Sequence, residues 1–379
     1  MKVPFNKPFI IGKELAYIKK AIVDNLQLSG DGPYTKLCHK WLEDNIGCKK
    51  AFITTSGTAA IEMAAVLFGF KPGDEIIMPS FTFVSTANAF VLRGAVPVFI
   101  DIREDTLNID ETLIEKAITQ RTRAIVPVHY AGYPCAMDKI MAIADRDGLK
   151  VIEDAAQGLM SSCSSGFLGT IGDAGCFSFH ETKNVISGEG GALILNDERM
   201  IEKAEIIWEK GTDRKKFIRG EVDKYTWVDI GSSYLPSELI AAFLFAQLQC
   251  AAKIIEKRRA IYNHYRRKLT PLAMARKLKL PAEQEGDNCN GHIFYIITKS
   301  VEEKSLLIKY LNRRGVNAVF HYVPLHSSPA GLKYGRTAGE MRVTDYISNR
   351  LIRLPMYYEM TRAKVEFVVR QIEKFYAKR

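Results

Sequence analysis

The sequence lacks paired cysteines and long apolar runs. Its seven cysteines are scattered without a CxxC spacing, which excludes a zinc ribbon or a dithiol redox pair, so we expect reduced thiols and no bound metal. The first thirty residues have no uninterrupted apolar core like that of a signal peptide, and no window approaches the ~18 apolar residues of a membrane span. We therefore expect a cytoplasmic protein that does not insert into a membrane.

The motifs of several common functional classes are also absent. No GKS or GKT follows a glycine loop, which argues against a P-loop nucleotide-binding site, and the glycines are too few for a dinucleotide-binding fingerprint. No GxSxG elbow accompanies His129 or His180, which argues against a serine hydrolase. The net charge of +10 could serve a nucleic-acid partner. No recognition module accompanies the densest basic run, residues 257–268, so a solvated helix face is favoured and no nucleic-acid partner is expected. An anionic nucleotide substrate would be served by the same positive field.

What the sequence does contain is a regular alternation of short apolar runs and helical patterns. Strands are predicted at 51–56, 74–80, 96–102, 124–130 and 150–155, with helices between them. Near-continuous apolar strands that alternate with helices are typical of a parallel sheet covered on both faces. The sequence therefore predicts an α/β protein, and its 379 residues favour two domains.

The rhythm changes in the second half of the chain. The runs CFSFH (176–180) and ALILN (192–196) lie close enough to pair, so part of the sheet is expected to be antiparallel. One long helix is predicted from Pro236 to about Leu269. Beyond it, strand-like runs at 292–298 and 318–324 alternate with helices at 301–314 and 361–377. We expect a large domain at 1–250 and a smaller α+β domain at 251–379.

The stretch from Lys150 to Asn196 contains the best chemical candidates. It contains a carboxylate at the end of an apolar strand, Asp154, then a lone lysine, Lys183, and a GEGG loop at 188–191. Pyridoxal phosphate requires a lysine for covalent attachment, an acid facing its pyridine nitrogen and donors for its phosphate. The turn TTSGTAA (54–60) between a strand and a helix suits a phosphate, although plain helix capping explains such a turn more often. Strand ends of one parallel sheet open on a common edge, which brings these candidates together.

These residues resemble the sugar-nucleotide aminotransferases, a branch of the pyridoxal-phosphate-dependent fold type I superfamily, over essentially the whole chain. The markers are SGTAA (56–60), MPSFTFVSTANA (78–89), VIEDAAQ (151–157), CFSFHETKN (176–184), GEGG (188–191) and FHYVPLH (320–326). The resemblance implies a large domain with a mostly parallel mixed sheet covered by helices, followed by a smaller C-terminal α+β domain.

The resemblance also implies a role for individual residues. Lys183 would bind the cofactor aldehyde and move the proton between the amino-acid Cα and the cofactor carbon. Asp154 would pair with the pyridinium nitrogen, Gln157 would lie by the ring hydroxyl, and Phe83 would stack on the ring. The remaining roles implied are phosphate binding by Gly57, Thr58 and Ser178, and substrate binding by His321 and His326.

The chain departs from the family pattern before the predicted long helix. Many relatives have G-x-N-x-R-M there, with the asparagine reaching the cofactor phosphate of the neighbouring subunit, whereas this chain has Gly231-Ser232-Ser233-Tyr234-Leu235-Pro236. Ser233 takes the asparagine position. The resemblance still implies a homodimer with shared active sites.

Within the family, the chain most resembles the branch of transaminases that act in enterobacterial common antigen synthesis. The strings that carry this resemblance are PSFTFVSTANAFVLRGA, ETLIE, VPVHYAG, SFHETKN and VDKYTW. The resemblance implies transfer of an amino group from L-glutamate to C4 of a dTDP-4-keto-6-deoxyhexose, giving dTDP-4-amino-4,6-dideoxygalactose. The alternatives are a UDP-linked or 3-keto sugar, a sugar dehydratase of the same fold, or a binding protein without catalysis. The related dehydratases have histidine in place of the lysine, so Lys183 disfavours a dehydratase. Lys183 and Asp154 together disfavour a binding protein without catalysis.

Overall fold

The computed structural model describes residues 1–282 and 288–378, so residues 283–287 and 379 of the expected small domain lie outside the described part. Its α-helices are α1 (Glu14–Val23), α2 (Pro33–Ile46), α3 (Gly57–Leu67), α4 (Val84–Val91), α5 (Ile114–Ala117), α6 (Met137–Asp147), α7 (Ile201–Trp208), α8 (Arg214–Ile218), α9 (Glu238–Leu248), α10 (Ala251–Met274), α11 (Val301–Arg313), α12 (Pro329–Tyr334), α13 (Arg342–Ser348) and α14 (Arg362–Tyr376). Short 3-10 turns are η1 (Glu111–Leu113), η2 (Tyr130–Gly132) and η3 (Glu198–Met200).

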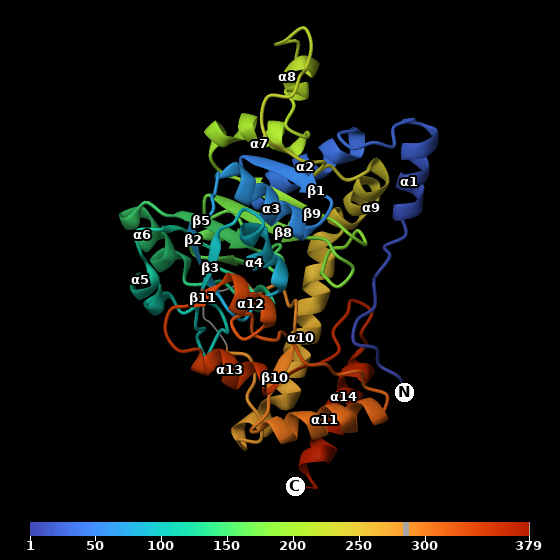
Figure 1. The fold of residues 1–379 in the computed structure, drawn as a ribbon. Coiled ribbons are helices and arrows are strands. Elements are labelled where there is room, and N and C mark those ends of the chain that lie inside the picture. Colours follow the sequence, from blue (N-terminus) through green and yellow to red (C-terminus); the bar gives the residue numbers. More distant parts are fainter. Residues whose placement is uncertain (283–287, 379) are drawn as a thin grey trace.

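The strands are β1 (Lys50–Thr54), β2 (Glu75–Pro79), β3 (Val96–Ile100), β4 (Thr122–Ile125), β5 (Lys150–Asp154), β6 (Ser162–Cys163), β7 (Gly166–Phe167), β8 (Ala174–Ser178), β9 (Gly191–Leu195), β10 (Tyr295–Ile297), β11 (Arg336–Thr337) and β12 (Leu351–Arg353). Eight of them form one sheet in the order β1-β9-β8-β5-β4-β2-β3-β11 (Figure 1). Only β9 runs antiparallel to its neighbours β1 and β8. The predicted α/β fold with a mostly parallel, mixed sheet is confirmed.

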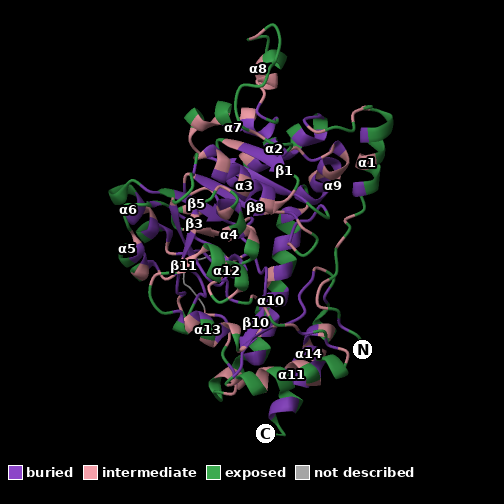
Figure 2. Ribbon diagram, viewed as in Figure 1, coloured by how far each residue is buried: buried purple, intermediate pink, exposed green. Residues whose placement is uncertain are grey.

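Helices bury both faces of this sheet. Successive side chains of a strand point to opposite faces and therefore enter different cores. Ile76 and Met78 belong to a core shared with α3, α4 and α7. Ile77, between them, belongs to a core shared with α5 and α6. At the β1 end, α1, α2 and α9 cover the sheet, and Figure 2 shows its strands as the most buried part of the molecule.

The single long helix predicted from Pro236 is wrong. The structure has two helices, α9 and α10, which meet at an angle of 59° around Gln249 and Cys250. Helix α9 is buried against α1 and α2, and the first turn of α10 packs in the same core. After the bend, Ile261, Tyr262 and Tyr265 of α10 pack in the C-terminal core. A straight helix could not bury both apolar faces.

The C-terminal segment forms a separate layer beside the sheet, below it in Figure 1. Here β10 and β12 pair antiparallel, and α10, α11 and α14 cover them. The strand predicted at 318–324 is wrong, because only Val319 makes a bridge, to Arg353. The following residues line a cavity instead.

Two buried carboxylates tie this C-terminal segment to the large sheet. Asp101, directly after β3, accepts hydrogen bonds from the backbone N–H groups of Val343 and Thr344 and so caps α13. Glu75, at the start of β2, forms a bidentate ion pair with Arg336 of β11 and also binds Arg121. Arg336 thereby secures β11 at the edge of the sheet.

Replacing Glu75 with glutamine is expected to lower the free energy of unfolding at neutral pH. The hydrogen bond and charge of Arg336 lower the pKa of Glu75 to about 2, so this stabilisation is complete above the ordinary glutamate pKa and is lost as the pH falls from about 4 towards 2. The cost at pH 7 should be on the order of 3 kcal/mol. Urea unfolding of both proteins at pH 7 and at lower pH measures it.

The matched control is Glu115→Gln, which removes an exposed ion pair with Arg146 and should change the stability by less than about 1 kcal/mol. A Glu75→Gln variant as stable as the control at pH 7, or a stability difference that did not shrink in acid, would contradict the role assigned to this pair.

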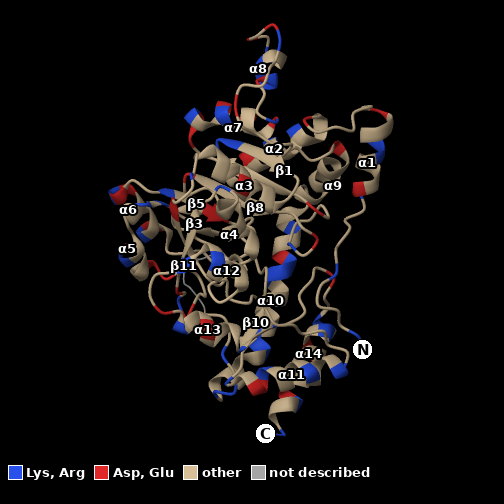
Figure 3. Cartoon of the chain, in the orientation of Figure 1, with Lys and Arg blue, Asp and Glu red and all other residues tan. Residues whose placement is uncertain are grey.

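Among the described residues, no single helix has the length and apolarity of a membrane span, and only the bent pair α9 and α10, taken together, reaches them. In the view of Figure 3, lysine and arginine side chains are dispersed over several helices, including α8, α10 and α11.

Candidate active site

The carboxyl ends of β1, β2, β5 and β8 lie at one edge of the sheet, because these four strands run in the same direction and β9 is the strand of this sheet that is reversed. A cavity of about 830 Å³ opens there and extends to the C-terminal segment. Its lining includes eight of the predicted site residues: Gly57, Thr58, Phe83, Asp154, Gln157, Ser178, Lys183 and His321.

One end of the cavity is suited to an anion. The N–H groups of Gly57 and Thr58 belong to the first turn of α3 and have no partner within that helix. A Cβ on Gly57 would lie 2.8 Å from that of Ser178, so only glycine allows the helix to approach β8 this closely. The hydroxyl groups of Thr58 and Ser85 lie 2.6 Å apart at the same place. Together with Ser178 they form a cradle for a phosphate.

Asp154 ends β5 and is almost fully buried beside the cavity. Its Oδ2 accepts a hydrogen bond of 2.7 Å from the hydroxyl of Thr86, and its Oδ1 accepts one of 3.1 Å from the Ala156 N–H. Both oxygens are therefore oriented by donors. Such a carboxylate can hold a proton on a ligand nitrogen.

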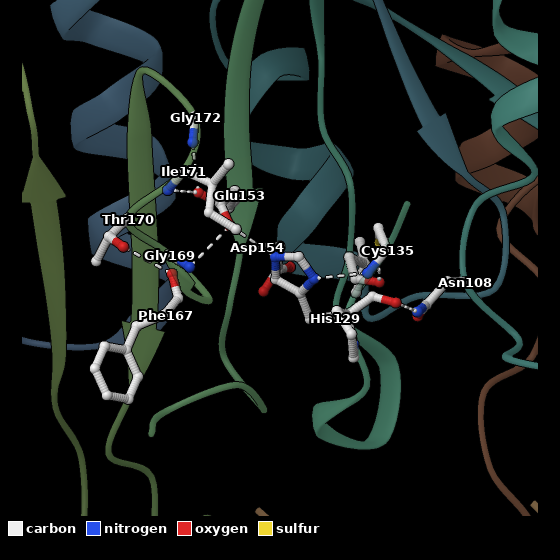
Figure 4. Close-up of polar contacts among 12 residues, drawn as sticks. Asn108, His129, Cys135, Glu153, Asp154, Phe167, Gly169, Thr170, Ile171 and Gly172 are labelled. Atoms are coloured by element: carbon white, nitrogen blue, oxygen red, sulfur yellow. Dashed lines mark hydrogen bonds and ion pairs between the residues drawn. The ribbon is translucent and has the colours of Figure 1, made fainter. Parts of the chain in front are cut away.

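The preceding residue, Glu153, is not part of the cavity lining. Its carboxylate instead contacts His129 and the loop at 169–172 (Figure 4). Its oxygens accept from the backbone N–H groups of Gly169, Ile171 and Gly172 at 2.7 to 2.8 Å. The fourth donor is Nε2 of the buried His129, whose Nδ1 accepts from the Cys135 N–H. The loop at 169–172 is thus fixed against β5, and both ring nitrogens of His129 are engaged in hydrogen bonds that support this arrangement.

Lys183 lies in the loop between β8 and β9 and reaches the same cavity. Burial lowers the pKa of its amine to about 8; the charge of Arg353 adds to this, and that of Asp154 opposes it. At neutral pH the neutral, nucleophilic fraction is therefore roughly two orders of magnitude larger than for a solvated lysine. Within residues 1–282 and 288–378, its Nζ makes no hydrogen bond or ion pair.

Gln157 and Phe83 both lie beside Tyr322. The Gln157 amide accepts from the Ala131 N–H at 2.7 Å and donates to the Tyr322 hydroxyl at 2.8 Å. The Phe83 ring is 56% exposed at the cavity mouth, with its centroid 6.4 Å from that of Tyr322. Both residues are placed where a flat ring could lie between polar and aromatic walls.

His321 takes part in a chain that ends on an arginine. Its Nε2 accepts from Arg353 Nη1 at 3.1 Å, so its Nδ1 carries the proton and donates to the Tyr130 hydroxyl at 2.7 Å. Burial lowers the pKa of His321, and Arg353 and Lys183 lower it further. The imidazole is therefore neutral with both nitrogens occupied, and it serves to orient Arg353.

Two predicted residues lie outside the cavity lining. His326 bonds to the Ser80 hydroxyl at 2.7 Å and faces Asp345 at 3.5 Å. Ser233 is exposed, and its backbone bridges to Glu209 at the base of the segment that carries α8. The predictions of substrate binding by His326 and of phosphate contact by Ser233 stay predictions.

Several residues of this site were not predicted from the sequence: Ser85, Thr86, Arg258, Tyr322 and Arg353. Arg258, expected on a solvated helix face, is buried. Arg353 had a detectable signal, because an arginine directly after the apolar pair Leu351 and Ile352 is as awkward to bury as Asp154 was. Thr86 had none, because a threonine in a helix has no pattern that names a partner 68 residues away.

These groups fit pyridoxal phosphate. The cradle at the α3 N-terminus matches the phosphate, Asp154 matches the ring nitrogen, and Lys183 offers an unpartnered amine of lowered pKa. The cradle exists because Gly57 has no Cβ.

Comparison with known proteins agrees with this geometry. Residues 10–373 match the DegT/DnrJ/EryC1/StrS aminotransferase family. The spore coat polysaccharide biosynthesis protein SpsC of Bacillus subtilis is 31% identical over 381 residues, which cover 98% of this chain and 96% of SpsC. GDP-perosamine synthase of Escherichia coli O157:H7 is 29% identical over 380 residues, 99% of each chain.

A solved structure of DesV from S. venezuelae, in complex with a ketimine intermediate, superposes with a TM-score of 0.89 at 28% identity and covers 99% of this chain and 98% of DesV. The match spans nearly the whole chain, including the cavity and the C-terminal segment that closes it. The protein therefore belongs to the DegT/DnrJ/EryC1/StrS aminotransferase family and is a pyridoxal-phosphate-dependent enzyme.

Proposed function

We propose that the enzyme transfers the amino group of L-glutamate to C4 of a dTDP-4-keto-6-deoxyhexose. The product would be dTDP-4-amino-4,6-dideoxygalactose, a precursor of a cell-surface polysaccharide, the enterobacterial common antigen. The observation that carries the proposal is a cationic cavity beside motifs that resemble this branch of the family. Supporting it, two relatives have names that refer to polysaccharide biosynthesis and to a GDP-linked sugar.

The charge of the cavity favours anionic substrates. Lys183, Arg258 and Arg353 all line it. Among the described residues, Arg258 binds the backbone carbonyls of Gly291 and His292, and neither arginine has a carboxylate partner. A guanidinium that is largely removed from water and has no paired carboxylate attracts anions strongly, because desolvation is costly for an unpaired charge.

Arg353 is the proposed anchor for the α-carboxylate of the amino donor. Its guanidinium lies over the Phe5 ring at 4.5 Å and is held by His321. A planar guanidinium fixed on one side can bind a carboxylate on the other through paired hydrogen bonds. The donor carbon would then be oriented towards Lys183.

The residues of the site then have distinct tasks. Pyridoxal phosphate supplies, when bound, an aldehyde for the amino group and an electron sink for the carbon that loses its proton. Lys183 Nζ removes that proton from the donor Cα and delivers it on the cofactor side, and in the second half of the reaction it works in reverse. Asp154 keeps a proton on the ring nitrogen, while Arg353 orients the donor.

Two sequential half-reactions test the proposal. The enzyme loaded with L-glutamate should change from the yellow aldehyde form to the amine form, and dTDP-4-keto-6-deoxyglucose should restore the yellow form. If only a UDP-linked sugar or a 3-keto sugar restored it, the aminotransferase assignment would stand and the proposed substrate would be wrong.

Replacing Arg353 should impair the half-reaction with L-glutamate and leave the half-reaction with the sugar ketone largely unchanged. Arg353→Met is expected to raise the KM for L-glutamate roughly 10- to 100-fold while the KM for the sugar ketone stays near that of the wild type, because a hydrogen bond to a charged group contributes ~1.5–3 kcal/mol. Arg350→Met is the matched control, since Arg350 stacks on Tyr346 outside the cavity lining. An unchanged KM for glutamate in Arg353→Met would assign the donor carboxylate to another group.

A homodimer with shared active sites belongs to the same proposal. The segment that carries α8 projects away from the sheet (Figure 1) and exposes apolar side chains, with Trp227 78% and Ile230 54% exposed. Ser233 lies at its base. Large exposed apolar groups on a projecting arm suit burial against a second copy.

Mixing two inactive variants tests the shared site. A Lys183→Ala subunit keeps the arm, and a subunit with Trp227→Ala and Ile230→Ala keeps the lysine. If the arm of one subunit completes the site of the other, co-refolded mixtures should regain activity through mixed dimers. A fully active monomer in sedimentation experiments would overturn the proposal.

A further inference from the structure

Two buried threonines extend from the cavity to Asp154. Thr82 precedes α4 and lines the cavity, and Thr86 lies one turn into that helix. Their hydroxyl oxygens are 2.8 Å apart, and that of Thr86 is 2.7 Å from Asp154 Oδ2. Thr82 and Thr86 are 1% and 0% exposed, so water does not compete for these hydrogen bonds.

The direction of the chain follows from counting protons. An ionised carboxylate can only accept, so the single hydroxyl proton of Thr86 is donated to Asp154. Thr86 then has no proton left for Thr82, and Thr82 must donate to Thr86. Successive hydrogen bonds polarise one another in a dry environment, so Thr82 strengthens the bond from Thr86 to Asp154.

A helical threonine ordinarily uses its hydroxyl within the helix. The usual acceptor is a carbonyl three or four residues earlier. Thr86 instead bonds to a residue 68 positions away on the central strand of the sheet. This contact ties α4 to the end of β5, and it gives Asp154 a donor on the oxygen that its other partner, the Ala156 N–H, leaves free.

We propose that Thr86, supported by Thr82, is a positioning residue that keeps Asp154 ionised and thereby keeps the proton on the ring nitrogen of the cofactor. Without the donor, the carboxylate holds its charge less well and competes more strongly for that proton. With the cofactor bound, the proton would then pass from the ring nitrogen to Asp154, breaking the ring N–H bond and forming an O–H bond on the carboxylate, so that the charged pair would become a neutral one. The cofactor withdraws electrons less strongly in that state.

The test compares Thr86→Val, which keeps the shape without the hydroxyl, with Thr86→Ser, which keeps the hydroxyl. Each holoenzyme is loaded with cofactor labelled with 15N at the ring nitrogen and examined by NMR. Wild type and Thr86→Ser should show a protonated ring nitrogen, and Thr86→Val should shift towards the unprotonated position. The half-reaction with L-glutamate should slow roughly 10- to 100-fold in Thr86→Val only, and less in Thr82→Val.

A protonated ring nitrogen in Thr86→Val would overturn the proposal, whatever the rate. So would a Thr86→Ser variant that behaved like Thr86→Val, because the hydroxyl would then not be the group that matters. If Thr86→Val does not fold, Thr86→Ala and Thr82→Val carry the same comparison, and an unshifted ring nitrogen in both would refute the role of the chain.

Discussion

Borohydride treatment of the yellow holoenzyme is expected to fix the cofactor to Lys183, and Lys183→Ala is expected to lose at least about three orders of magnitude in transamination rate. Lys183 lines the cavity with an amine whose pKa is lowered to about 8 and which has no hydrogen-bond or ion-pair partner among the described residues. Its loss removes both the covalent attachment point and the group that moves the proton. Peptide mapping of the reduced enzyme identifies the labelled lysine.

Lys36→Ala, at an exposed position of α2, is the control. Borohydride should fix the cofactor to it as in the wild type, and its transamination rate should be unchanged. Lys183→Ala should still bind the cofactor, because the cradle at Gly57 and Thr58 and the carboxylate of Asp154 remain. A label found on another lysine, or none, would overturn the assignment.

Asp154→Asn should retain the cofactor but lose two to three orders of magnitude in the rate of each half-reaction. A neutral amide no longer holds the ring nitrogen protonated, so the carbon that loses its proton is less well stabilised. An ion pair in a largely dry site contributes ~2–4 kcal/mol to the transition state, which corresponds to this factor. Rapid-mixing spectroscopy with L-glutamate measures it.

Asp145→Asn, at an exposed position of α6, is the matched control and should leave both half-reactions unchanged. An Asp154→Asn variant within a few-fold of the wild type would show that a different acid protonates the ring. The outcome also bears on Thr86, whose hydroxyl acts only through Asp154.

The fold could be predicted because its signals are local. The central strands of the sheet are short apolar runs, and residues such as Ile76 and Ile77 are both buried because α/β sheets are covered on two sides. The edge strand β11, Arg336–Thr337, has no such signal. The antiparallel pair of β8 and β9 could be expected because the two apolar runs lie close enough in the sequence to pair across the loop that carries Lys183. The break between α9 and α10 could not be predicted, because it depends on two cores that form only when distant segments pack.

The same division applies to the site. Asp154 and Lys183 could be singled out because their residue types, strand-end positions and surrounding motifs are visible along the chain. Tyr322 lies within the run 318–324, which was expected to be a strand, whereas Arg353 ends β12, a strand that was not predicted. The bridge between Val319 and Arg353 brings these two segments together beside the cavity. Their roles depend on partners far away in the sequence.

By itself, the sequence determined the alternation of elements, the edge of the sheet where strand ends meet, and the acid and lysine that this edge presents. The tertiary structure decided which hydroxyl orients Asp154, which arginine faces the cavity without a carboxylate, and how far burial lowers the pKa of Lys183. The physical reason is that periodicity and strand ends are properties of neighbouring residues. Desolvation and hydrogen-bond partnership are set by whatever the folded chain places within a few ångströms.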